Sequence, residues 1–171
     1  VAIAQLEAGL AAAVPVVRAM PNTPAVVQRG VTALAPGTHA ETHHLRVAHE
    51  LFRGVGMVAE VPETAMDAVT AVSGSGPAYA FFLMEAMCAA AVRHGLSEEL
   101  ATRMVIETVR GAGELAARAH EPPPVLRRQV TSPGGTTEAA LNVLTACGVH
   151  DAFCAAITAA VERSHSLGRQ L

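Results

Sequence analysis

Met57-Val58-Ala59-Glu60-Val61-Pro62 is the stretch on which the fold class of this sequence turns. Its apolar residues predict a short strand, and the proline ends that strand. Strand and helix signals alternate before it, whereas no convincing strand signal returns after it. The sequence therefore predicts a partial α/β unit over residues 1–62 and an all-helical domain over residues 63–171, so that the chain is mostly helical overall.

Upstream of this stretch, the pattern predicts the remaining elements of the α/β unit. Pro15 opens a short apolar run and Pro21 stops it, as expected for a buried strand with its exit loop. Leu45, Ala48 and Phe52 recur at helical spacing, and Thr38 with Glu41 has the spacing of a capping box in front of that helix. The predicted elements are a helix end at 3–10, strands at 16–20 and 30–35, and a helix behind residue 41.

Downstream of Pro62 every segment reads as helix. Ser73-Gly74-Ser75-Gly76-Pro77 interrupts the first helical run, and Ser97 with two glutamates behind it marks a helix start. The run from Ala78 to Arg93 is apolar on almost all sides, which is typical of a helix inside a bundle or at a subunit interface. The predicted helices cover residues 63–72, 78–93, 97–119, 125–129, 138–146 and 151–167.

Composition narrows the class of protein. Hydrophobic residues make up 51% of the 171 and aromatic residues 3%, with a formal net charge of −3 and no lysine. The absence of a basic stripe argues against nucleic acid as a ligand, and no unbroken apolar stretch argues for a membrane span. The three cysteines, an odd number without the spacing of a metal site, suit packing in a reducing compartment, which predicts a cytoplasmic protein. The opening at Val1, inside a helix-like segment without a charged leader, is expected of a piece of a longer chain.

The strongest candidate for chemistry is Thr131-Ser132-Pro133-Gly134-Gly135-Thr136-Thr137-Glu138. Two glycines allow a ligand to approach the backbone, and the following helix start directs free N–H groups at the same place, which suits a carboxylate. Ser132, Thr136 and Thr137 add hydroxyl donors. An ordinary loop that precedes a helix has the same pattern, and the chemistry of these residues alone leaves both interpretations open.

Two other clusters carry weaker signals. The Ser73–Pro77 segment resembles the loop above but reads more simply as a helix break with proline in the first turn. His39 and His43 have the spacing of two metal ligands on a helix, but no cysteine or carboxylate set completes them, so no metal site is predicted.

Three segments together resemble the pyrroline-5-carboxylate reductase family, in the family's order and over essentially the whole chain. Arg18–Pro24 looks like the family's strand and loop beside the nicotinamide. Asp67–Tyr79 is similar to the kinked helix that opens its helical domain, and Leu126–Leu141, with Ser-Pro-Gly-Gly-Thr-Thr at its centre, looks like the family signature.

This resemblance implies reduction of 1-pyrroline-5-carboxylate to L-proline by NADPH or NADH, the last step of proline biosynthesis. It places the substrate carboxylate on Ser132 and the backbone of Gly135 and Thr136, with Thr137 as the catalytic residue near the ring nitrogen. By the same resemblance Met20, Asn22 and Thr23 contact the cofactor.

The family also implies a homodimer, or a larger ring of dimers, built by the helical domain. Residues 1–62 then correspond to a remnant of a Rossmann-like domain without the Gly-rich turn that holds the cofactor phosphates. An inactive helical oligomerisation module is the alternative. A relative that reduces another small carboxylate is less favoured, because the loop suits a compact cyclic amino acid.

Overall fold

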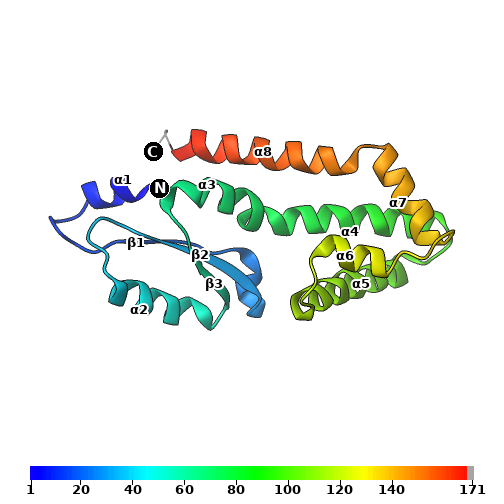
Figure 1. Ribbon diagram of the computed structural model, residues 1–171, viewed down its shortest axis with the longest axis horizontal. Helices are drawn as coiled ribbons and strands as arrows, with labels where there is room; N and C mark the ends of the chain where they lie inside the picture. Colours follow the sequence, from blue (N-terminus) through cyan, green and yellow to red (C-terminus); the bar gives the residue numbers. More distant parts are fainter. Residues whose placement is uncertain (169–171) are drawn as a thin grey trace. The chain divides into compact units, whose positions relative to one another are not determined.

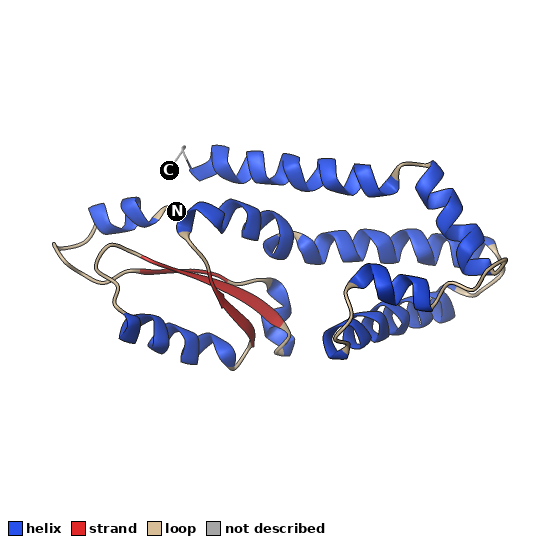
Figure 2. Ribbon diagram, in the orientation of Figure 1, coloured by secondary structure: helices blue, strands red, loops and turns tan. Residues whose placement is uncertain are grey.

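A computed structural model describes residues 1–168, which form two compact units. One unit contains Val1–Ala78 together with the chain from Ala155 onward, and the other is Tyr79–Cys154. Figure 1 labels the elements along the chain, and Figure 2 shows the strands in red. Every strand of the described residues lies between Val1 and Ala78, in the first unit. The α/β fragment followed by helices is thus confirmed as a fold class. The domain boundary at Pro62 stays a prediction, and the last three residues of the predicted helical domain lie outside the described residues.

The first unit is built on a three-stranded mixed sheet with the strand order β1-β2-β3. β1 (Val17–Met20) pairs antiparallel with β2 (Gly30–Pro36), and the short 3₁₀ helix η1 (Thr23–Val27) joins them. β3 (Gly56–Glu60) runs parallel to β2, and α2 (Thr42–Arg53) makes the crossover that parallel strands need. The strands predicted from the sequence are therefore confirmed to within a residue or two at each end.

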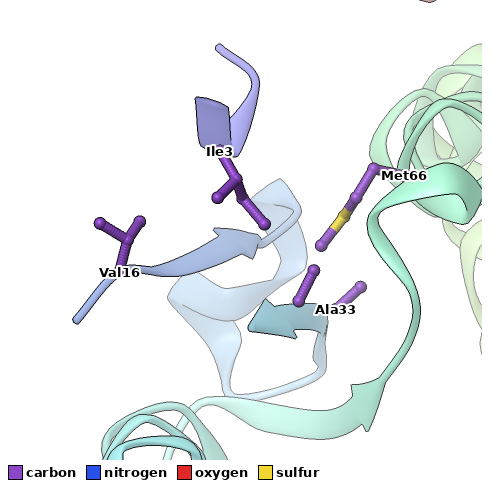
Figure 3. Packing of buried hydrophobic residues seen from close by; sticks show 5 residues of the cluster. Ile3, Val16, Ala33 and Met66 are labelled. Carbon is purple, nitrogen blue, oxygen red and sulfur yellow. The ribbon is translucent and has the colours of Figure 1, made fainter. Parts of the chain in front are cut away.

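The core of this unit is a small cluster of apolar side chains. Figure 3 shows Ile3 of α1 (Ile3–Ala8), Ala33 of β2 and Met66 of α3 (Met66–Val69) pointing toward one another, with Val16 at the approach to β1. Met66 is 1% exposed although it comes after the sheet, so the first turn after Pro62 packs on the strands rather than away from them. Burial of apolar surface is the main term that holds α1 and α3 on the sheet.

One local prediction was wrong. Thr38 and Glu41 do not form a capping box, because α2 begins at Thr42 and Glu41 itself occupies the N-cap position. Thr38 instead binds the carboxylate of Glu7, with its N–H 2.6 Å from Oε1 and its hydroxyl 2.9 Å from Oε2. That acceptor comes from a residue 31 positions away, so spacing could not reveal it.

A pair of glycines fixes the start of the parallel ladder. Gly56 has φ +150°, and a Cβ atom there would collide with the backbone oxygen of Gly30, its partner in the register. The N–H of Gly30 donates to the carbonyl of Val55 at 2.9 Å. Only residues without a side chain allow the two backbones to approach this closely.

Beyond Pro62 the chain changes helix type three times without leaving helix. The 3₁₀ turn η2 (Glu63–Ala65) leads into α3, and the π-helical turn η3 (Thr70–Gly74) follows and leads into α4 (Gly76–Arg93). The N–H of Ser75 reaches the carbonyl of Thr70 at 2.9 Å, a bond five residues long. The interruption predicted at residues 73–77 is therefore a π turn within a continuous helical run, a feature that recurs at functional sites.

The second unit consists of helices. Ser97 caps α5 (Glu98–Arg118) by accepting a hydrogen bond from the N–H of Leu100 at 3.3 Å, as its sequence predicts. Within the described part of this unit, only Ala101 and Val105 are buried. Its other elements are most of α4, α6 (Pro123–Gln129), α7 (Thr136–Ala146) and the beginning of α8 (Val149–Gly168).

The helical run Glu63–Arg93 is long and apolar enough to cross a membrane by length and composition, and none of its most apolar window is buried in the chain. α7 and α8 pass the same test only if taken together across a bend of 53°. Core helices of water-soluble proteins meet this test too. The exclusion of a membrane span drawn from the sequence therefore stays a prediction.

Candidate functional site

Local hydrogen bonds fix the conformation of the glycine-rich loop between α6 and α7. Thr131 donates its hydroxyl to the carbonyl of Arg127 at 2.6 Å, which ties the loop to the end of α6. The N–H of Gly135 donates to the carbonyl of Ser132 at 3.0 Å, and Gly134 adopts φ +70° to make the turn. A Cβ atom on Gly135 would lie 3.0 Å from that same oxygen, so the turn leaves little room for a side chain there.

The start of α7 presents free polar groups to the outside. Gly135 is its N-cap and has no side chain to bind the first-turn N–H groups. Thr136 and Thr137 are exposed, and within residues 1–168 neither their hydroxyls nor that of Ser132 have a hydrogen-bond partner in the chain. The carboxylate of Glu138 accepts from the N–H of Gly134 at 2.8 Å and steadies the loop from inside the helix. N–H groups and hydroxyls gathered in this way suit a carboxylate ligand.

The residues proposed for the cofactor lie in the other compact unit. Met20 ends β1, and its terminal methyl lies so close to Gly74 that a Cβ there would be 2.8 Å from it. Asn22 donates from Nδ2 to the carbonyl of Ser73 at 3.0 Å and accepts at Oδ1 from the N–H of Val31 at 2.8 Å. Thr23, the first residue of η1, is exposed.

A cavity of about 400 Å³ is lined in part by Met20 within the same unit. Glu63 lines it and accepts hydrogen bonds from the N–H of Ile3 at 2.6 Å and from Arg18 at 3.2 Å. On another part of its wall, the hydroxyl of Ser164 donates to Asp67 at 2.6 Å. Sequence reasoning missed this group, because its members are single polar residues 45 to 97 positions apart and share no spacing pattern.

The histidine cluster does not complete a metal site in the described residues. His44 accepts a hydrogen bond at Nδ1 from the N–H of Glu41 at 3.0 Å, and the His43 and His44 rings lie 3.7 Å apart. No group of three or more histidine, cysteine, aspartate or glutamate side chains in residues 1–168 is placed to hold a metal ion.

The predicted site residues thus form two groups. Ser132, Gly135, Thr136 and Thr137 share one loop and helix start in the unit Tyr79–Cys154. Met20, Asn22 and Thr23 follow one strand in the unit that holds the sheet. Their roles in binding stay predictions.

Comparison with known proteins identifies relatives along the whole chain. Residues 63–167 match the family described as pyrroline-5-carboxylate reductase dimerisation. A pyrroline-5-carboxylate reductase of Synechocystis is 45% identical over 155 residues, which cover 91% of this chain and 58% of the relative. That of Pseudomonas aeruginosa is 44% identical and covers 98% of this chain and 62% of the relative.

Solved structures give the same result. The pyrroline-5-carboxylate reductase of Coxiella burnetii aligns with a TM-score of 0.91 and 41% identity, over 95% of this chain and 60% of that one. The pyrroline carboxylate reductase of Plasmodium falciparum with NADP bound aligns with a TM-score of 0.90 and 31% identity, over 98% and 68%. The chain spans about three-fifths of the length of the curated relatives that it matches.

Proposed function

The chain belongs to the pyrroline-5-carboxylate reductase dimerisation family, and we propose that the complete protein reduces 1-pyrroline-5-carboxylate to L-proline with NADPH or NADH. The observation that carries this proposal is the loop Ser132–Thr137, with exposed hydroxyls and the uncapped start of α7. Reductases with this name align over more than nine-tenths of the chain, which supports the same reaction.

The loop would act by holding the substrate. The hydroxyl of Ser132 and the N–H groups of Gly135 and Thr136 bind the carboxylate, which fixes the orientation of the five-membered ring. The N–H of Gly135 is shared in this arrangement between the ligand and the carbonyl of Ser132, to which it donates at 3.0 Å. Thr137 then lies beside the ring nitrogen and donates a hydrogen bond to it as hydride reaches the adjacent carbon. The chain positions the substrate for the cofactor, which is the main contribution of a protein to hydride transfer.

The cofactor supplies hydride, and the residues of this chain fit only its nicotinamide end. Met20, Asn22 and Thr23 lie at the exit of β1 in the unit that holds the sheet, and we assign them to that end. The described residues contain no Gly-rich strand-turn-helix that would hold a pyrophosphate. The Plasmodium falciparum relative was solved with NADP bound, which supports a nicotinamide cofactor here.

A second copy of the chain is the proposed partner. α4 has no buried residue, and Phe81, Phe82 and Leu83 are 62%, 69% and 47% exposed within one chain. Such a surface is stable in water once another protein covers it. The family match over 63–167 supports a homodimer and a helical domain that begins after Pro62. We also propose that such dimers assemble into a larger ring and that the protein is cytoplasmic.

The alternative is that the helices serve only as an oligomerisation module. The same exposed apolar side chains of α4 favour it, because self-association through them requires no catalysis. Both proposals predict a dimer, but only the first predicts turnover.

Turnover by the complete gene product tests the function. We expect 1-pyrroline-5-carboxylate to drive oxidation of NADPH or NADH, with L-proline as product. The reaction is monitored as a fall in the absorbance of the reduced nicotinamide. The 171-residue chain alone should show little turnover, because its described residues contain no phosphate-binding turn. A complete protein that forms dimers but has no activity with either cofactor would leave the oligomerisation module as the function.

A further inference from the structure

The carbonyl of Ser73 has no donor within its own helix. In an α-helix, a carbonyl accepts from the N–H four residues further on, and for Ser73 that residue is Pro77, which has no N–H. The next N–H along, that of Ala78, binds the carbonyl of Ser75 at 2.9 Å. Pro77 thus leaves the carbonyl of the half-buried Ser73, in the π turn Thr70–Gly74, in need of a partner from elsewhere.

Asn22 supplies that partner from a distant part of the chain. Its Nδ2 lies 3.0 Å from the Ser73 oxygen, 51 residues away in sequence. Its Oδ1 accepts from the N–H of Val31 in β2 at 2.8 Å. Only one orientation of the carboxamide satisfies both bonds, since the carbonyl requires a donor and the amide requires an acceptor.

The two bonds hold three elements together where Met20 meets Gly74. Asn22 follows β1 by two residues, and its side chain joins the exit of β1 to β2 and to the π turn. The terminal methyl of Met20 packs against Gly74, where a Cβ would be 2.8 Å away. A shift of the Asn22 carboxamide would therefore move Met20 relative to the π turn.

We infer that Asn22 is a positioning residue: its carboxamide clamps the exit of β1 onto the π turn and so sets the place of Met20. This inference rests on the proposed function, in which Met20 lies at the nicotinamide end of the cofactor. Besides the place at the cofactor assigned to it above, Asn22 acts through its neighbours, with one donor and one acceptor of its amide used within the protein.

Two variants of the complete protein test the clamp. Asn22→Asp keeps the acceptor for Val31 but replaces the donor to Ser73 with a carboxylate oxygen. Gln28→Glu is the matched control, because it makes the same amide-to-carboxylate change at an exposed position at the end of η1. We expect Asn22→Asp to raise the KM for NADPH about tenfold or more, since small displacements at a reaction centre are costly. The KM for 1-pyrroline-5-carboxylate should stay within about twofold, as should both constants in the control.

The double variant Asn22→Asp with Pro77→Ala separates positioning from plain stability. Alanine at 77 has the N–H that proline lacks and that an α-helix directs at the residue four positions earlier, so we expect the double variant to regain part of the unfolding midpoint lost in Asn22→Asp and still show the raised KM for NADPH. Recovery of that KM would mean that Asn22 only satisfies a carbonyl, which overturns the inference, as would an unchanged KM in Asn22→Asp. If the parent itself does not reduce the imine, the proposed function fails before any variant is compared.

Discussion

At the scale of single residues, Thr137 has a role in the proposed reaction and contributes little to the stability of the fold. Its hydroxyl is exposed and has no partner within residues 1–168. We expect Thr137→Ala to lower kcat of the complete protein about tenfold to a hundredfold, as the loss of a hydrogen-bond donor to the reacting group does. The free energy of unfolding should change by less than about 0.5 kcal/mol. Thr137→Ser, which keeps the hydroxyl, is the control, and an alanine variant with the parent's kcat would remove Thr137 from the mechanism.

Glu63, by contrast, contributes to the stability of the fold. Its carboxylate binds both the N–H of Ile3 and the guanidinium of Arg18, and it is 35% exposed while Arg18 is 20% exposed. Glu63→Ala should lower the free energy of unfolding by about 1–3 kcal/mol, because it leaves two partly buried donors unpaired. Urea denaturation measures this loss.

Glu60→Ala is the matched control for Glu63→Ala. It removes an exposed glutamate three residues earlier, at the end of β3, and should cost less than about 0.5 kcal/mol. Equal losses in the two variants would show that the contacts of Glu63 add nothing to stability.

At the scale of elements, the sequence predicted what depends on neighbours in the chain. Ser97 caps α5 from within its own first turn, and the three predicted strands, each bounded by proline or glycine, form where expected. The predicted capping box at Thr38 does not form, because Thr38 binds the distant carboxylate of Glu7 instead. The contact between Asn22 and the π turn could not be predicted either, since it joins residues 51 positions apart.

The candidate site divides in the same way. The loop Ser132–Thr137 is a contiguous motif, so its residues could be named from the sequence. Glu63, Asp67 and Ser164 meet around a cavity only through tertiary packing, and no pattern of residue types marks them beforehand.

Gly56 gives the prediction that belongs to the sheet. Because a Cβ at this position would collide with the backbone of Gly30, Gly56→Ala should separate the start of β3 from β2. We expect a loss of more than about 2 kcal/mol in the free energy of unfolding, since positive φ and a backbone collision act together. Gly54→Ala, two residues earlier with open space around it, is the control and should have little effect. Comparable melting temperatures for the two variants would contradict the close approach.

At the scale of the whole molecule, the exposed face of α4 predicts self-association. Sedimentation of the chain should give a dimer at micromolar concentration, and Phe82→Glu should shift it toward monomer, because a charge on a buried contact is costly. Val26→Glu is the control, since Val26 is 89% exposed but lies in η1 on the other unit. Dissociation by both variants, or by neither, would contradict a dimer formed through α4.

The sheet has a further effect on how these 171 residues behave in a test tube. Among the described residues β1 pairs only with β2, so the opposite edge of β1 offers its backbone N–H and C=O groups to any extended strand. Open edges of this kind are templates for aggregation. Samples of the short chain should therefore precipitate slowly at high concentration by a route that Phe82→Glu does not block. Any dimerisation constant must then be measured in dilute solution, before that second process sets in.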